Sequence, residues 1–301
     1  MQCLKSAKWL ALFSLGTTSC DVHQPSVSEN GRFFYANESS DNYSFLLDDK
    51  PAVIPKYTVG SVMLKPGLHS MAINGGKVIH FMVYPGNKGG ILNPQRNFYY
   101  TYNFIYGNNG ISSIYHLTVQ ELVVRDYLLK GRLHSSNSYV IDNNVFNCDY
   151  PIGTKIPENL DSSTTVSKVK TKCFSQEELI KNLTEGEIFI SQMLARKGVF
   201  SRDESATLSF EYPLNRPDFR DENIQHYADN VMEIVKVYRE STNPSQKQDF
   251  YNQYHTIVLK MVAIYDTWES DGVCVEEKQK YEDFMVQTRA IFSAGTLIQQ
   301  Q

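Results

Sequence analysis

The chain has 301 residues, of which 42% are hydrophobic and 21% are charged, and its formal net charge is −4. These proportions are typical of a globular protein and argue against a disordered or membrane-embedded chain. A mildly acidic chain without a cluster of basic residues also argues against nucleic acid as a partner. The length is sufficient for two domains.

The chain begins with the pattern of a secretory signal peptide. Lys5 and Lys8 precede a short apolar run over residues 9–15, and small residues follow over 16–19. The apolar run is too short to span a bilayer, which needs about 20 apolar residues. We therefore expect residues 1–19 to be a signal peptide and the protein to leave the cytoplasm.

Cys20 directly follows this segment, which is therefore similar to a bacterial lipoprotein signal. In that family the cysteine is lipidated and becomes the mature N-terminus, although Thr17 stands here where the family usually has leucine. The resemblance implies a lipid anchor at Cys20 and a folded part that faces the periplasm. Asp21 implies retention in the inner membrane. The alternative is an ordinary cleaved signal with Cys20 as a structural thiol. Residues 20–30 are polar, contain Pro25 and are expected to form a tether.

Short β-type runs separated by turn residues occupy the next part of the chain. The clearest runs cover residues 32–36, 43–47, 61–64, 68–73 and 77–84. Further runs cover residues 98–106, 139–146 and 114–129, and the last of these could instead hold a helix. Asn74-Gly75 is a strong hairpin signal, because both residues tolerate a positive φ. Short strands at this spacing are typical of an antiparallel sandwich. We therefore expect a β-sandwich-like domain over residues 31–148.

The remainder of the chain changes from irregular to helical. Residues 149–174 are rich in Pro, Ser and Thr and are expected to be a connecting segment. The sequence from Ser175 to Glu178 is a capping box that marks a helix start. Apolar residues then recur at spacings of three and four between residues 224 and 292, which predicts amphipathic helices packed antiparallel. The expected class is α+β, with a helical domain over 175–301.

Five cysteines are present, and three of them remain after the signal and anchor are set aside. Disulfides persist in the oxidising compartment that export implies. Cys148 and Cys173 bracket the connecting segment, so the sequence favours a disulfide between them and a free thiol at Cys274. The alternative is that all three are reduced core residues, as cysteine often is.

No catalytic motif stands out in the sequence. It lacks the serine hydrolase elbow, the zincin helix pattern and the phosphate-binding loop. His69 and His80 lie on neighbouring predicted strands and could approach a metal ion together with Asp48 or Asp49, but a pair on a wet sheet face is the favoured interpretation. We therefore expect a protein that is not an enzyme, with no metal ion and no cofactor.

Two turn motifs resemble a small periplasmic sandwich of the PEGA type. They are Asp48-Asp49-Lys50, which lacks the family's glycine, and Leu64–His69. Residues 89–94 and the lipoprotein-like start also resemble enterobacterial lipoproteins encoded beside type VI secretion lipase effectors. That resemblance implies an immunity protein that binds a lipase-type toxin in the periplasm. The alternatives are an envelope enzyme without a recognisable motif and a structural lipoprotein of an envelope assembly.

A Gly- and Asn-rich loop over residues 86–94 precedes a run of tyrosines. Such a loop can present backbone donors to a partner, and tyrosine is a favoured interface anchor. Strand alternation places Tyr100 and Tyr102 on one face and Tyr99 on the other. A long turn followed by tyrosines packed on a sheet is the alternative. The predicted partner-binding residues are Asn87, Lys88, Gly89, Gly90, Tyr100 and Tyr102.

Overall fold

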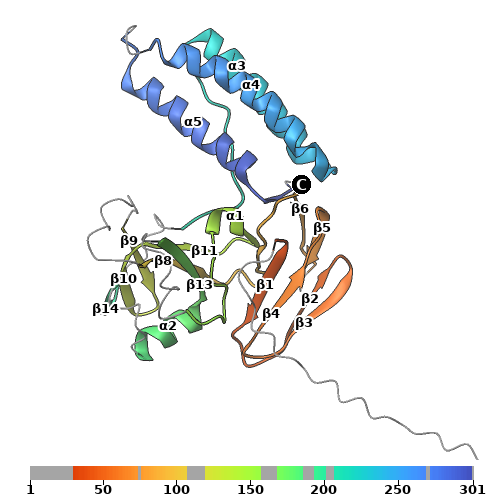
Figure 1. Cartoon of the computed structure of the whole chain (residues 1–301), viewed down its shortest axis with the longest axis vertical. Coiled ribbons are helices and arrows are strands. Elements are labelled where there is room, and N and C mark those ends of the chain that lie inside the picture. Colours follow the sequence, from red (N-terminus) through yellow and green to blue (C-terminus); the bar gives the residue numbers. More distant parts are fainter. Residues whose placement is uncertain are drawn as a thin grey trace, which may run out of the picture.

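The computed structural model describes residues 30–73, 76–106, 119–156, 168–185, 193–200, 207–268 and 272–299. These residues form two β lobes side by side, with a bundle of three helices standing on them (Figure 1). The predicted α+β class, with N-terminal sheets and C-terminal helices, is confirmed. The predicted signal peptide, Cys20, residues 21–29 of the tether and the Asn74-Gly75 turn lie outside the described residues.

The first lobe consists of two sheets packed face to face. One has the strand order β12-β7-β1-β4 and the other has the order β15-β6-β5-β2-β3. All of their pairings are antiparallel except β1 with β7. Phe33 from one sheet and Phe45, Met71 and Phe81 from the other meet in the core between them. The strands are β1 (Arg32–Asn37), β2 (Tyr43–Leu47), β3 (Lys50–Ile54), β4 (Thr58–Met63), β5 (Gly67–Ala72), β6 (Val78–Val83), β7 (Gly90–Leu92), β12 (Val140–Asp142) and β15 (Thr296–Ile298).

The second lobe also has two sheets, with the orders β11-β8-β13 and β14-β10-β9. Helix α2 (Gln176–Glu185) contributes Leu179 to the core of this lobe. The start of α2 is capped as predicted, because Ser175 Oγ accepts the Glu178 N–H at 3.3 Å. The expected division by a connecting segment over residues 149–174 is therefore wrong, because β13, most of which lies within that segment, pairs with β8, and β14, which follows it, pairs with β10. The strands are β8 (Tyr99–Tyr106), β9 (Gln120–Val124), β10 (Tyr127–Gly131), β11 (Leu133–Ser136), β13 (Lys168–Ser175) and β14 (Leu194–Lys197).

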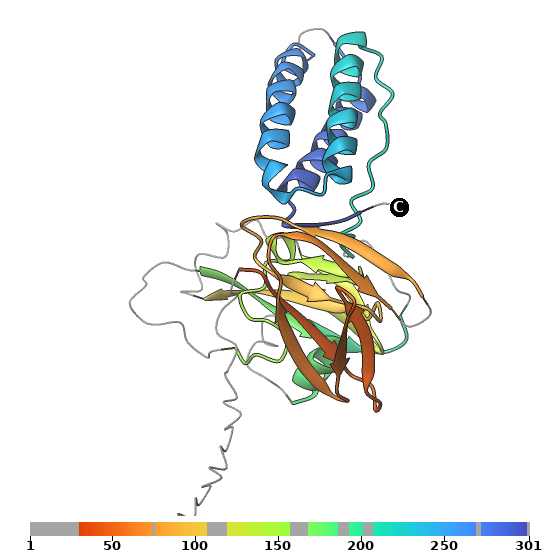
Figure 2. The same cartoon turned by 90° about the vertical axis from the view of Figure 1, so that its right-hand side faces the viewer.

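The helical bundle begins at residue 222. Its helices are α3 (Glu222–Glu240), α4 (Lys247–Tyr265) and α5 (Val275–Ser293), with a 3-10 turn over Pro244–Gln246 before α4. Figure 2 shows the three helices packed side by side. The predicted apolar faces meet inside the bundle, where Val231, Met261 and Phe284 are buried. Among the described residues, no helix has the length and apolar character needed to cross a bilayer.

Several contacts tie the bundle to the first lobe. The chain returns from α5 as β15, which pairs with β6. Asp142 is buried just before α1 (Asn143–Phe146), where it accepts N–H bonds from Asn144 at 3.1 Å and from Gly295 at 2.6 Å. Tyr84 stacks on Tyr238 with ring centroids 5.2 Å apart. Burial raises the pKa of Asp142 to about 6, because the buried site disfavours its charged form.

Candidate functional site

The predicted recognition loop is largely packed against neighbouring strands. The Asn87 carbonyl accepts the Gly31 N–H at 3.1 Å, and the buried Asn87 side chain accepts the Gly89 N–H at 2.6 Å. Gly89 has a φ of +80°, and a Cβ there would lie 1.9 Å from the Arg32 carbonyl oxygen. Gly90 is buried within β7. The prediction that Asn87, Gly89 and Gly90 face a partner is therefore wrong. The glycines allow close contact between backbones and are not displayed.

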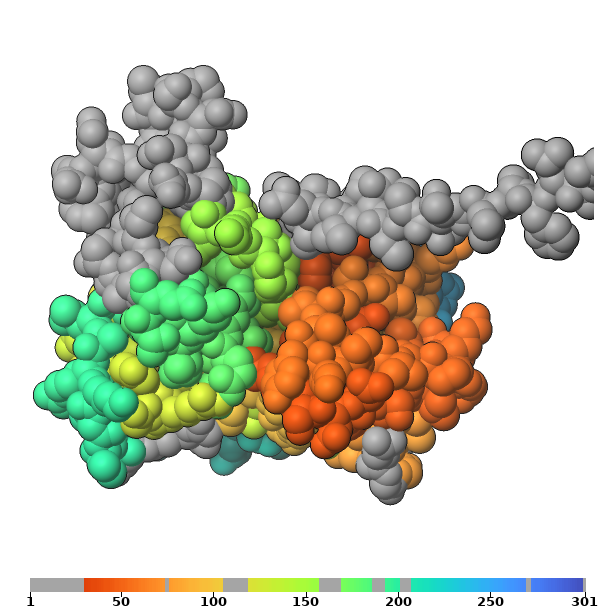
Figure 3. All heavy atoms as spheres, turned by 90° about the horizontal axis from the view of Figure 1, so that it is seen from below, coloured from red at the N-terminus to blue at the C-terminus, as the bar shows by residue number. Residues whose placement is uncertain are grey.

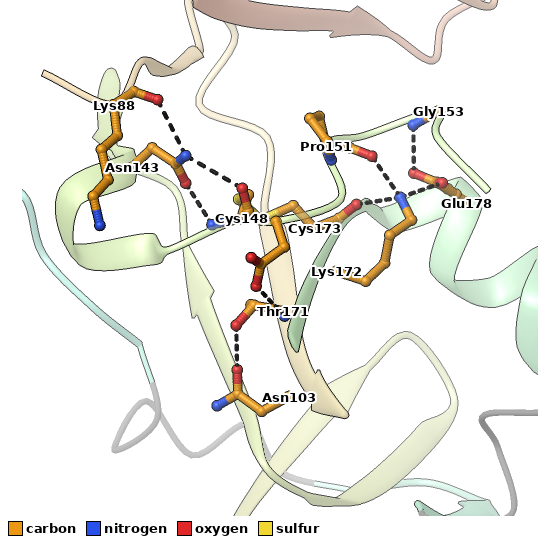
Figure 4. The surroundings of a disulfide bond; sticks show 11 residues. Lys88, Asn103, Asn143, Cys148, Pro151, Gly153, Thr171, Lys172, Cys173 and Glu178 are labelled. Atoms are coloured by element: carbon orange, nitrogen blue, oxygen red, sulfur yellow. Dashed lines mark hydrogen bonds and ion pairs between the residues drawn. A yellow bond between two sulfur atoms is a disulfide. The ribbon is translucent and has the colours of Figure 1, made fainter. Parts of the chain in front are cut away.

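Lys88 is the exception in this loop, because its side chain is exposed. Its backbone is fixed by the two asparagines of α1. The Lys88 N–H donates to Asn144 Oδ1 at 2.8 Å, and the Lys88 carbonyl accepts from Asn143 Nδ2 at 3.2 Å. Figure 4 shows the Lys88 ammonium group pointing away from the bond to Asn143. Lys88 thus remains available as a surface contact.

The predicted contacts Tyr100 and Tyr102 are core residues, with exposed fractions of 1% and 0%. The predicted alternation is correct, since both point into the second lobe's core while Tyr99 joins the cluster shared with the bundle. The predicted exposure is wrong, because β8 lies between β11 and β13 and both of its faces are covered. The Tyr100 hydroxyl donates to Gln176 Oε1 at 3.2 Å.

A disulfide joins Cys148 to Cys173, the pair that the sequence favoured, with Cα atoms 5.5 Å apart (Figure 4). Cys274 keeps a free, partly buried thiol at the start of α5. Cys173 lies within β13, so the predicted connecting segment ends in a strand. The bond fixes the chain that follows α1 to β13, an edge strand of the second lobe.

A buried lysine lies beside this disulfide. Lys172 Nζ donates to the Pro151 carbonyl at 2.8 Å, to the Cys173 carbonyl at 2.5 Å and to Glu178 Oε1 at 2.7 Å. Glu178 also accepts the Gly153 N–H at 3.1 Å. Burial lowers the pKa of Lys172, and the Glu178 carboxylate opposes that change. Because three acceptors take all three ammonium protons, the arrangement is a structural clamp and not a free amine.

His69 and His80 do not converge on a metal site. His69 lies opposite Phe81 in the β5–β6 register, so His80, one residue away, points to the other face of the sheet. His69 instead contacts Asp48 Oδ2 and the Lys65 carbonyl, each at 2.8 Å. These contacts join the two turns that carry the PEGA-like resemblance. Within the described ranges, no three His, Cys, Asp or Glu side chains gather closely enough to hold a metal ion.

An apolar row crosses the outer face of the five-stranded sheet. We define it as Pro51, Leu46, Ala72 and Val78, which lie opposite one another on β3, β2, β5 and β6. Leu46 is 40% exposed and Val78 is 38% exposed. The sequence analysis missed the row because it predicted no strand at Pro51. One sequence signal for an exposed apolar face was present in β2. Phe45 and Leu46 are consecutive apolar residues, so one of them must point inward and the other, Leu46, must point outward.

Comparisons of the chain with protein-family models, with curated proteins and with solved structures returned no match. The functional argument therefore depends on the residues of this chain.

Proposed function

We propose that this protein is a binding protein of the bacterial envelope. It is exported, anchored by a lipid at Cys20 and faces the periplasm. Its partner is a membrane-attacking toxin of the lipase type, which it inhibits by covering the toxin. The apolar row carries this proposal, because it is an exposed apolar face on a rigid sheet.

The form of the apolar row suits protein recognition. Its side chains come from four adjacent strands, so their spacing is fixed by the sheet register. Val53 and Leu68, with exposed fractions of 58% and 41%, extend the apolar surface on the same face. Soluble proteins rarely expose large contiguous apolar patches without a binding role. A stable complex would bury about 1,200–2,000 Å² in total, with the row near its centre.

Two further observations favour export and anchoring. The Cys148–Cys173 disulfide is of a kind that persists in oxidising compartments and is rare in the cytosol. The sequence before residue 20 has the pattern of an export signal and places Cys20 where lipoproteins carry their anchor. An anchored inhibitor would have a high effective concentration at the membrane that a lipase attacks.

The test is co-expression of this protein with a periplasm-directed lipase-type toxin. Leu46→Ser combined with Val78→Ser should abolish protection, because each hot-spot contact is worth more than about 1 kcal/mol. The control is Leu259→Ser combined with Val286→Ser, which changes exposed apolar residues of α4 and α5. Both proteins should fold as the wild type does by circular dichroism. Equal protection by the two double variants would refute the apolar row as the interface.

No protection by the wild type against any such toxin would refute the inhibitor proposal itself. Anchoring has a separate readout. The Cys20→Ser protein should no longer be labelled by fatty acid and should be released as a soluble periplasmic protein. Continued labelling of that variant would contradict the proposed anchor.

A further inference from the structure

We propose that the free edge of β4 binds an extended segment of another protein, with an uncharged centre and acidic ends, as an added strand. β4 is the last strand of the sheet β12-β7-β1-β4, and β1 is its one neighbour among the described strands. All six of its residues are at least partly exposed. Figure 3 shows the orange strands of the first lobe at the surface, beside the green and yellow second lobe. Neither the proposed toxin nor the anchor at Cys20 is needed for this binding.

The main chain of β4 presents a row of free hydrogen-bonding groups at this edge. The Leu64 N–H donates to the Gly31 carbonyl at 2.9 Å, so the backbone of Leu64 faces β1. Because backbone groups alternate in direction along a strand, those of Val59, Ser61 and Met63 point away from β1. Within the described ranges they bond to no other backbone group. Their N–H groups and carbonyls are therefore arranged to pair with an added strand.

The sequence of β4 lacks the features that usually prevent such pairing. Edge strands are commonly protected by charged residues, by proline or by a bulge. The strand Thr58–Met63 contains neither a charged residue nor a proline, and its register with β1 is unbroken. The edge strands β3, β9 and β14, by contrast, carry Pro51, Glu121 and Arg196. The edge of β4 is thus open to an added strand.

The side chains of β4 define what the added strand carries at its centre. Val59 and Met63 lie on the outer face of the sheet, with exposed fractions of 45% and 50%. Ser61 lies between them on the same face. Side chains directly opposite one another on paired strands lie about 5 Å apart, so apolar residues of the added strand would cover Val59 and Met63. The centre of the bound segment is therefore uncharged, with apolar residues at alternate positions.

Exposed lysines lie beyond both ends of β4. Lys56 and Lys65 form no ion pair with any residue in the described ranges. An added strand with a carboxylate at each end would place a negative charge near each lysine. A second copy of β4, paired antiparallel about Ser61, would instead bring Lys65 of one copy close to Lys56 of the other. Like charges across a strand pair are destabilising, so the charge pattern favours a different chain with acidic ends.

The experiment measures binding of a labelled peptide, Glu-Thr-Val-Thr-Val-Thr-Val-Thr-Glu, to the Cys20→Ser protein by fluorescence anisotropy. The same peptide with lysine at both ends should bind about tenfold more weakly, because two attractions become repulsions. Ser61→Pro removes the central outward N–H without breaking a bond to β1, and should weaken binding of the acidic peptide about tenfold. Ser61→Ala loses the same hydroxyl but keeps the N–H. It is the control and should bind within about twofold of the parent protein.

The outcomes decide between occupants of the edge. No binding of the acidic peptide, or equal affinity of the Ser61→Pro and Ser61→Ala proteins for it, would overturn the proposal. If Ser61→Pro does not fold, a peptide N-methylated at its central valine replaces that variant and should bind the parent protein about tenfold more weakly. Equal binding of the acidic and lysine-ended peptides would overturn the requirement for acidic ends. Self-association of the parent protein in analytical ultracentrifugation, lost in Ser61→Pro, would assign the edge to a second copy and also overturn the proposal.

Discussion

Removal of the Cys148–Cys173 disulfide should destabilise the protein substantially. The bond links residues that are 25 positions apart in the sequence. On the chain-entropy model, releasing a loop of that length from the unfolded chain costs about 3.5 kcal/mol of folding free energy at 25 °C. Cys173 is fully buried within β13, so loss of its sulfur also leaves a small cavity. We therefore expect the Cys148→Ala/Cys173→Ala protein to lose at least about 3 kcal/mol.

The assay is urea unfolding followed by circular dichroism. The double variant should unfold at lower urea and show a larger m-value, because an uncrosslinked unfolded chain exposes more surface. Cys274→Ala is the control, since Cys274 has a free thiol, and its stability should change by less than about 1 kcal/mol. Non-reducing peptide mapping should recover Cys148 linked to Cys173. If the free energy of unfolding of the double variant were less than about 1 kcal/mol below that of the wild type, this account of the disulfide's role would be refuted.

Three further predictions concern buried polar and aromatic groups. Tyr100→Ala should lower the free energy of unfolding, measured in urea, by about 3–5 kcal/mol. Tyr57→Ala, at an exposed position, should lower it by less than about 0.5 kcal/mol, and similar values for the two variants would contradict the burial of Tyr100. Lys172→Met should lower the free energy of unfolding by about 3–5 kcal/mol, because it leaves Glu178 without its buried partner. Adding Glu178→Gln should restore part of this loss, and strictly additive effects of the two substitutions would disprove the coupling. Asp142 has a folded pKa of about 6 against an ordinary value of 3.8, so folding favours its protonated form. The stability of the wild type relative to Asp142→Asn should therefore rise by up to about 3 kcal/mol as the pH falls from about 6 to about 4. Urea unfolding at a series of pH values measures this difference. A decrease in the relative stability over that range would contradict the buried site.

Local pattern was sufficient to find many of the elements. The run over residues 43–47 is β2 with the same bounds, and the apolar spacing after residue 224 marks three real helices. Strand β3 was missed because it contains Pro51, a residue that sheets tolerate at an edge, and β3 is an edge strand. The C-terminal strand β15 gave no local signal, because its partner β6 lies more than 200 residues earlier in the chain.

The division into lobes was beyond the reach of local pattern for the same reason. Strand β8 pairs with β13, across the expected domain boundary, and β7 pairs with β12 across the second lobe's strands. Such partners are chosen by long-range packing, which turn residues and periodicity do not report. The sequence predicted a single sandwich because short strands and turns have the same appearance in one lobe or in two.

The candidate site shows the corresponding limit for function. A glycine such as Gly89 signals a positive φ or a close approach, but it does not say whether the neighbour is a partner or the protein's own backbone. Here the neighbour is Arg32. Alternation correctly separated Tyr99 from Tyr100, but it could not report that β8 has neighbours on both sides and both faces covered. Exposure depends on the complete sheet, and for that reason the tyrosines were misassigned.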